Sequence, residues 1–494
     1  MPLPDNGAPW PPPTLGHLYR EMRVDDAWYS GDRRRLADVH QDHQDHQHRR
    51  DGRRRLWARH RHPQPGRHDT RLHIPLPADI ATTSADLLFS EPPTFTVADP
   101  ATQARLDEIT EAGGIANTLL EAAEVAAALG GVYLRVTWDA SLAARPLLTA
   151  VHADCAIPEF RWGQLATVTF WRELSADGST VWRHLERHEV GRILHGLYQG
   201  TTDSLGTRTP LTEHPETAPL ADSLSFEGDT IETGLDQLTA AYVPNIRPNR
   251  RHRGSPFGRS DYQSAHDLFD ALDETWSSWL RDIRLARARL IVPDGYLRDH
   301  GPGRGASFDD DREIWQALSI PPGDNNAAGI TLSQFAIRVA EHQQTADAIM
   351  RQAVQLAGYS AQSFGLGDST AATATEVTAR ERRSMITRDK KSRYWAPALA
   401  DMLLVMLRLD QSLYTPALAP ERPVIVFEDS VSEDPQSVAQ TLSLLQQAQA
   451  VSTDAKVRIL HPDWDDDAVQ AEVDRILTET GQAVPDPMQV GSLA

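Results

Sequence analysis

The sequence contains a single cysteine, Cys155, among its 494 residues. A lone cysteine excludes an internal disulfide and any zinc or iron–sulfur site that needs several cysteines of one chain. The nearest histidine, His152, lies at an odd separation from it, and on a strand an odd separation points two side chains to opposite faces. We therefore interpret Cys155 as a small buried residue rather than a catalytic nucleophile.

Lysine is almost absent as well. Lys390, Lys391 and Lys456 are the only ones, so that 46 of the 49 basic residues are arginine. Together with the abundance of alanine and aspartate, this bias indicates a GC-rich coding genome and no particular chemistry.

The sequence has no long apolar run. None approaches the roughly 18 consecutive apolar residues of a membrane span, and residues 1–5 lack the basic and apolar regions of a signal peptide. With 49 basic and 69 acidic residues the net charge is −20, and such a surface repels polyanions. We expect a globular protein of the cytoplasm, without a membrane partner and without the basic face of an ordinary nucleic-acid binder.

Catalytic motifs are also missing. The glycine cluster at 301–305 lacks the Gly-Lys-Ser/Thr ending of a phosphate-binding loop, which argues against an ATP-driven motor. His184 and His188 would share a metal on a helix, but on a strand they stand about 13 Å apart. The sequence therefore predicts no enzyme, no cofactor and no metal site.

Local patterns predict an α+β protein. Helical spacing of apolar residues runs over 102–129 and ends at a glycine pair, and 132–139 has the pattern of a strand. Strands predicted at 146–153, 165–174 and 179–197 form an antiparallel sheet. Four arginines stand in the loop that follows: Arg247, Arg250, Arg251 and Arg253. The loop is expected to pair with acidic neighbours, and phosphate contact is the alternative.

The second half of the chain is predicted to be mostly helical. An amphipathic helix over 261–287 precedes a Gly/Asp-rich span at 294–328, and a second helix ends before Gly358. A capping box at 373–376 opens a helix that runs to about residue 410, polar in its first half and buried in its second. Pro397 inside it predicts a kink near 393–397. A strand at 423–427 and helices at 434–450 and 466–480 complete the prediction.

Several segments together carry a resemblance to a known family. They are Ser84–Pro93, Gly254–Ala288 with Gly258–Tyr262, Tyr359–Asp410 with Thr373–Val377 and Lys391–Trp395, and His461–Trp464. In order and spacing they resemble the portal proteins of tailed bacteriophages, of the type found in siphophages of Gram-positive, including actinobacterial, hosts. The likeness covers most of the chain from about residue 74.

The resemblance implies a portal-protein fold and a division of the chain. The parts are a wing with an antiparallel sheet (74–257), a stem helix (258–288), a clip (289–330), a second stem helix (331–357), a tunnel loop (358–372), a kinked helix with further wing (373–430) and a helical crown (431–480). Composition, and not the resemblance, predicts a flexible, solvated N-terminal segment (1–73, including the His/Arg-rich tract 40–73) and a loose tail (481–494).

The resemblance also implies the function. About twelve copies would form a ring at one capsid vertex, through which terminase threads double-stranded DNA and to which the tail attaches. The implied partners are the terminase large subunit, a head-completion or adaptor protein, and the major capsid and scaffold proteins. The protein would reside in the virion after assembly in the host cytoplasm. An acidic wall would let the duplex slide.

The tunnel loop would face the DNA. Its candidate residues are Ser363, Phe364, Gly365, Leu366, Gly367 and Asp368, with Phe364 and Leu366 at the tip. Two other functions stay open. One is a metal-dependent hydrolase or nuclease that uses His184 and His188. The other is a minor capsid or adaptor protein that binds the vertex without forming the channel.

Overall fold

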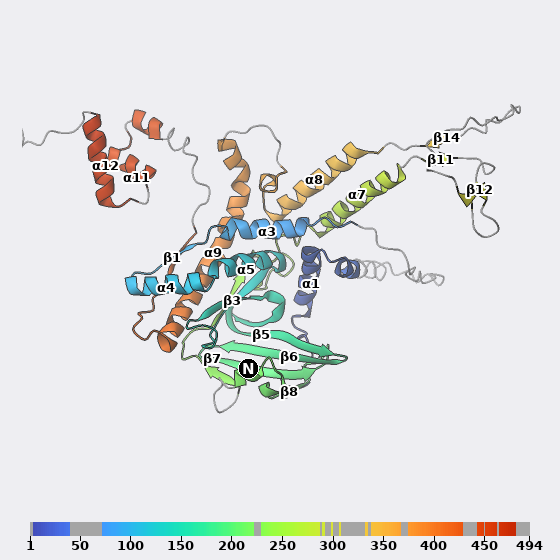
Figure 1. Cartoon of the computed structure of the whole chain (residues 1–494), viewed down its shortest axis with the longest axis horizontal. Helices are drawn as coiled ribbons and strands as arrows, with labels where there is room; N and C mark the ends of the chain where they lie inside the picture. Colours follow the sequence, from blue (N-terminus) through green and yellow to red (C-terminus); the bar gives the residue numbers. More distant parts are fainter. Residues whose placement is uncertain are drawn as a thin grey trace, which may run out of the picture. The chain divides into compact units, whose positions relative to one another are not determined.

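The computed structural model describes residues 3–39, 72–221, 229–286, 289–291, 298–299, 306–307, 331–333, 337–366, 374–427, 442–448, 450–461 and 464–480 (Figure 1). The chain divides into a large unit of Met1–Ala371 with Thr378–Phe427 and a small unit of Ala372–Val377 with Glu428–Ala494. Helices alternate with strands that all pair antiparallel within the described residues, which confirms the α+β class.

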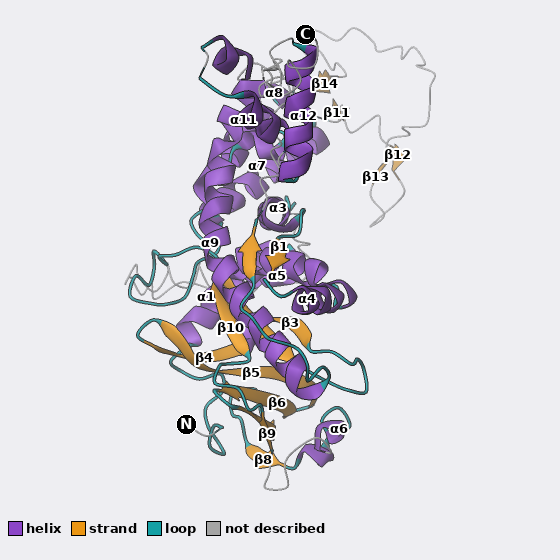
Figure 2. Cartoon of the chain, turned by 90° about the vertical axis from the view of Figure 1, so that its left-hand side faces the viewer, coloured by secondary structure: helices purple, strands orange, loops and turns teal. Residues whose placement is uncertain are grey.

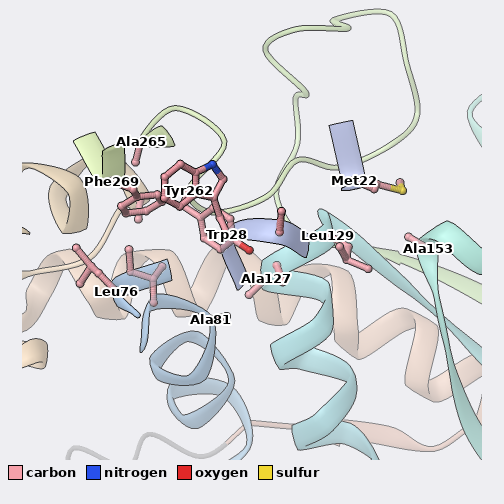
Figure 3. Packing of buried hydrophobic residues seen from close by; sticks show 14 of the residues in the cluster. Met22, Trp28, Leu76, Ala81, Ala127, Leu129, Ala153, Tyr262, Ala265 and Phe269 are labelled. Carbon is pink, nitrogen blue, oxygen red and sulfur yellow. The ribbon is translucent and has the colours of Figure 1, made fainter. Parts of the chain in front are cut away.

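The described part of the N-terminal segment is folded, so the prediction of a flexible 1–73 is wrong for residues 3–39. Helix α1 (Gly16–Ser30) buries Tyr19, Met22 and Trp28 in the main core, and the Tyr19 hydroxyl donates to the Ala156 carbonyl at 2.8 Å. Figure 3 shows Trp28 beside Tyr262 and Phe269. Apolar burial of this size orders the segment. Most of the His/Arg-rich tract lies outside the described residues.

Three helices follow in the large unit, α3 (Leu76–Phe89), α4 (Pro100–Ala112) and α5 (Ile115–Leu129). The single helix predicted over 102–129 is two helices, because Gly114 adopts the left-handed conformation (φ 61°) between them. Gly130 caps α5 at φ 86°, where the sequence predicted its end, and β2 (Gly131–Thr137) begins directly after it.

Two antiparallel sheets form the β part. In the first, β2 lies between β10 (Ala240–Pro244) and β3 (Leu147–His152). The second has the order β4-β5-β6-β7-β8, with β9 also paired to β7 (Figure 2). Its strands are β4 (Ala156–Arg161), β5 (Gln164–Asp177), β6 (Thr180–Glu189), β7 (Arg192–Gly200), β8 (Thr207–Thr209) and β9 (Thr230–Glu232). The strand predicted over 179–197 is a hairpin, since Gly191 turns the chain at φ 86°.

The short helices of this region are η1 (Ala153–Cys155), η2 (Leu211–Glu213) and α6 (Ala218–Ala221). Cys155 therefore lies in a turn after β3 and is half-buried. Burial raises the pKa of its thiol to about 12, with Asp154 adding to the rise, so the sulfur stays protonated and unreactive at neutral pH.

Two amphipathic helices, α7 (His266–Leu285) and α8 (Val339–Ala357), run side by side away from the sheets (Figure 1). They are antiparallel, because Asp282 near the end of α7 lies 3.0 Å from His342 near the start of α8. Strands β11 (Arg289–Ile291) and β14 (Thr331–Ser333) pair with each other, as do β12 (Arg298–Asp299) and β13 (Ala306–Ser307). The strand-like start predicted at 331 thus pairs back onto the beginning of the insertion.

The longest helix, α9 (Ala374–Leu413), is continuous through Pro397, and the kink stays a prediction. Its second half is buried as predicted, and Trp395 packs edge-on against Phe89 with ring centroids 4.9 Å apart. The first half is more buried than predicted, since Lys391 and Ser384 are each 1% exposed. Strands β1 (Thr94–Thr96) and β15 (Val424–Val426) pair beside this second core.

The small unit contains α11 (Thr453–Leu460) and α12 (Asp466–Glu479), which pack through Val457, Val469 and Val473. α12 confirms the helix predicted at 466–480. The sequence analysis missed α11, although Ser452 caps it by accepting from the Ala455 amide.

Candidate functional site

A buried polar cluster joins three of the segments that carry the family resemblance. Ser84 comes from α3, Asp261 from the turn before α7, Tyr359 from the residues after α8, and Lys391 from α9. The Lys391 Nζ lies 2.6 Å from Asp261 Oδ2 and 2.5 Å from Ser84 Oγ. The side chains of Lys391 and Asp261 are 1% and 0% exposed. This cluster, called the joint below, connects both helices of the α7/α8 pair to α3 and α9.

The carboxylate of Asp261 has a donor for each oxygen. Besides the ammonium group, the Tyr359 hydroxyl donates to Oδ2 at 2.7 Å and the Asn245 Nδ2 donates to Oδ1 at 2.8 Å. Burial lowers the pKa of Lys391, and Asp261 opposes that change by favouring the charged form. Burial and the charge of Asp261 raise the pKa of Tyr359 well above its usual value, so its hydroxyl stays a donor.

The turn that carries Asp261 passes very close to the end of α5. A Cβ at Gly258 would lie 2.2 Å from the Gly130 carbonyl oxygen, so only glycine fits there. The Asp261 amide donates to the Ala127 carbonyl at 3.0 Å, and the buried Tyr262 hydroxyl donates to the Asp25 carbonyl at 3.1 Å. Backbone and side-chain hydrogen bonds thus fix the position of Asp261 before α7 begins.

The first part of the predicted tunnel loop is tied to α9. Thr387 Oγ1 donates to the Gly358 carbonyl at 2.6 Å, and Ser384 Oγ accepts from the Ser360 amide at 2.9 Å. Ser363, in the short helix η4 (Ala361–Phe364), has its Oγ 2.9 Å from Ser384 Oγ. The segment 358–366 therefore rests on the helix that follows it.

The apolar residues predicted at the tip of this loop lie elsewhere. Phe364 and Leu366 are partly buried and pack against the main core, because their side chains find apolar neighbours there. Gly365 is exposed, with φ 68°. Gly367 and Asp368 lie outside the described residues.

The four arginines after β10 do not share one environment. Arg251 donates to the Gln263 carbonyl at 3.2 Å and lies 3.7 Å from Glu21. Arg247, Arg250 and Arg253 are exposed and form no ion pair with a described carboxylate. The expected pairing with acidic neighbours is therefore confirmed for Arg251 alone, and phosphate contact stays a prediction.

The histidines of β6 are hydrogen-bonded in the interior. His184 Nε2 lies 3.1 Å from His195 Nδ1, and His188 contacts Thr239 Oγ1 at 2.6 Å and Glu186 Oε1 at 2.9 Å. Burial lowers the pKa of His184 to about 4, and the charge of His195 adds to the decrease. Over the part of the chain that the structure describes, no three His, Cys, Asp or Glu residues are grouped to hold a metal. The metal-hydrolase alternative thus gains no site from these histidines.

None of the described helices has both the length and the apolar character needed to cross a membrane.

Comparison with known proteins supplies the family. The model of the family described as "Phage portal protein, SPP1 Gp6-like" matches residues 17–486. No curated protein matches the chain. Among solved structures, a chain from "Neck of empty GTA particle computed with C6 symmetry" is similar at 14% identity and a TM-score of 0.43, and one from "Virion of native gene transfer agent (GTA) particle" at 14% and 0.42. Each alignment covers 78% of this chain and 89% of the other.

At these identities and TM-scores the structural likeness carries no weight, so the assignment rests on the family match. That match spans nearly the whole chain and includes the three segments that meet in the joint. The chain therefore belongs to the SPP1 Gp6-like family of phage portal proteins, structural proteins of the capsid vertex.

Proposed function

We propose that the chain is one subunit of a ring of about twelve copies at one capsid vertex, and that double-stranded DNA passes along the axis of this ring. The observation that carries the proposal is the α7/α8 pair together with the joint that fixes its base. An antiparallel helix pair that is held at one end by a buried ion pair is a rigid element, and one such pair from each subunit could form the channel wall. The insertion between α7 and α8 begins and ends at the other end of the pair, where Asp282 lies 3.0 Å from His342.

In this proposal the parts keep the roles that the family resemblance implies. Helices α7 and α8 are the stem, the insertion at 289–330 is the clip, and the sheets form the wing. The loop at 358–372 faces the tunnel, and 431–480 form the crown. The clip meets the terminase large subunit and a head-completion or adaptor protein, while the wing meets the major capsid and scaffold proteins.

The charge of the stem supports DNA passage without tight binding. Helices α7 and α8 together carry seven acidic and three basic side chains. Asp267, Glu274 and Glu341 are exposed. Each fixed cation near a phosphate strengthens DNA binding, so a wall with an excess of carboxylates lets the duplex slide.

The residues proposed to face DNA are Ser363–Asp368 of the tunnel loop. Support comes from Gly365, which is exposed and has a positive φ that favours glycine. Phe364 and Leu366 would reach the channel only after leaving the core. Deletion of 361–369 should leave rings assembled and impair DNA packaging. Normal packaging by the deletion variant would refute the assignment of this loop.

The proposed setting is the virion, after assembly in the host cytoplasm, in a phage of Gram-positive and actinobacterial hosts. The preference for arginine over lysine supports a GC-rich host of that kind.

The first experiment is native mass spectrometry of the purified chain with negative-stain imaging. We expect a ring of about twelve subunits with an axial hole. A chain that binds the vertex without forming a ring would favour the adaptor alternative. A monomer with stoichiometric bound zinc or manganese, together with a catalytic activity that His188→Ala abolishes, would favour the hydrolase.

A further inference from the structure

One residue of the turn before α7 has no partner for its side chain. Gly258 and Tyr262 are used in packing and Asp261 in the joint, whereas the Arg259 side chain forms no recorded hydrogen bond among the described residues. Its Nε and Nη1 are buried without an acceptor. Buried donors without acceptors cost free energy, and a guanidinium group has five donors to satisfy.

The charges around Arg259 add to this deficit. Asp261, whose negative charge acts on Arg259, is already bonded to Lys391, Tyr359 and Asn245. Burial lowers the pKa of Arg259, and the positive charge of Arg250 lowers it further, with Asp261 opposing both. This corner of the chain therefore has an excess of positive charge and lacks an anion.

The loop that carries Arg250 is held in place beside this corner. Asn249, buried, donates from Nδ2 to the Gly258 carbonyl at 3.0 Å and accepts from the Arg251 and His252 amides at 3.0 and 3.2 Å. These hydrogen bonds fix the backbone of the loop that carries Arg247, Arg250 and Arg253. With Arg259 they form what we call the arginine face.

A matching acidic surface lies on α3 and α5. Asp86 and Glu121 are exposed and Glu124 is half-buried, and none of the three forms an ion pair with a described basic residue. Glu124 accepts from the Tyr29 hydroxyl at 2.6 Å. Burial raises the pKa of Asp86, and the negative charge of Glu124 adds to the rise. The three carboxylates are called the acidic face.

We propose that the arginine face of one copy binds the acidic face of the next copy of this chain. The inference rests on the ring proposed above and names the contact that holds it. The contact joins two different surfaces, as a closed ring of identical subunits requires. Guanidinium groups suit it because they form bidentate hydrogen bonds with carboxylates. A DNA phosphate is the less suitable occupant, because the carboxylate of Glu21 stands beside Arg251 in this loop and would repel it.

Charge reversal tests the contact. Arg250→Glu with Arg253→Glu should lower the ring fraction in native mass spectrometry at least tenfold, and Glu121→Arg with Glu124→Arg should do the same. A chain that carries all four changes should regain rings, because every interface is then complementary again. Arg161→Glu, at an exposed arginine of the β4–β5 turn, is the control and should assemble normally.

Arg259→Gln separates a contact role from a role in the fold. The melting temperature of the monomeric fraction should be unchanged or higher, because a buried unpartnered charge is removed, while the ring fraction falls. A lower melting temperature would assign Arg259 to the fold of one chain and overturn its place in the contact.

Other outcomes are equally decisive. Normal rings from both double variants, or no recovery in the fourfold variant, would overturn the contact while the ring itself stands. Normal rings with weaker duplex DNA binding by Arg250→Glu would make the arginines phosphate contacts. A wild-type chain that forms no rings would remove the proposed ring and this contact together.

Discussion

Replacement of Lys391 by methionine should destabilise the large unit strongly. The change removes the ammonium group that lies 2.6 Å from Asp261 and leaves a carboxylate in the interior at 0% exposure. Only the Tyr359 hydroxyl and the Asn245 amide would still donate to it. Removal of one partner of a buried ion pair costs about 3–5 kcal/mol, because the remaining charge has no compensation. Ser84 also loses its partner, at a further cost of about 1 kcal/mol.

The double variant Lys391→Met/Asp261→Asn should recover most of that loss. With both charges gone, an amide of similar shape remains beside Asn245 and Tyr359, and replacement of both partners is far less costly than removal of one. We expect the double variant to lie within about 2 kcal/mol of the wild type, so that the two single effects are strongly non-additive.

Urea unfolding at pH 7, followed by circular dichroism and tryptophan fluorescence, measures these changes. Lys390→Met is the matched control, because Lys390 is adjacent to Lys391 in sequence but exposed, and it should change stability by less than about 0.5 kcal/mol. A Lys391→Met variant within 1 kcal/mol of the wild type, or a double variant equal to the sum of the two singles, would refute the account of the joint.

Three further predictions rest on other parts of the large unit. Burial lowers the pKa of His184 from 6.5 in the unfolded chain to about 4 in the folded protein. The unfolded state therefore binds a proton that the folded state does not, and stability falls by about 2 kcal/mol as the pH is lowered from 7.5 to 5. The urea midpoint of His184→Gln should fall less than that of the wild type over the same pH range. Gly258→Ala places a Cβ 2.2 Å from the Gly130 oxygen and should cost about 2 kcal/mol or more in a melting assay, whereas Gly254→Ala, with nothing within 4 Å, should be nearly neutral. Trp395→Ala should cost about 3–5 kcal/mol, and Trp162→Ala, at a side chain that is 96% exposed, should cost less than about 0.5 kcal/mol.

Strong local patterns made several elements predictable. The apolar stripe of α7, the glycine cap of α5 and the strand after it each depend on neighbours within a few residues. The predicted boundaries of helices and strands were wrong where a single residue changed the direction of the backbone. Gly114 divides a stretch with continuous helical spacing, and Gly191 divides a stretch with continuous strand character.

The N-terminal segment shows how composition can mislead. The His/Arg-rich tract suggested a solvated tail, and the prediction extended that property to residue 1. Leu18, Tyr19 and Met22 already lay at helical spacing, and this signal could have been separated from the tract that follows it. What no local signal reveals is the surface that receives α1, which includes Tyr262 and Phe269 from far along the chain.

The joint was not predictable from any pattern. Asp261 and Lys391 are 130 positions apart, and Lys391 lies in the polar half of α9, which the sequence analysis placed outside the core. One weak signal was available: a chain that uses arginine almost everywhere has a lysine at this position. A compact ammonium group fits between Asp261 and Ser84 in a site where a planar guanidinium group would need more space.

The joint constrains how a portal subunit of this sequence moves. Asp261 stands just before α7 and Tyr359 just after α8, so both helices of the α7/α8 pair connect at their base to one buried carboxylate, and through Lys391 to α9. A rotation of this pair against α9 would open the ion pair in a dry environment, at the cost of about 3–5 kcal/mol that applies to Lys391→Met. The segment 358–366 is tied to α9 by separate hydrogen bonds from Ser384 and Thr387. Each of those costs about 1 kcal/mol to break, so residues 360–366 would separate from α9 at a lower electrostatic cost than the α7/α8 pair, although the contacts of Phe364 and Leu366 with the main core would be lost as well.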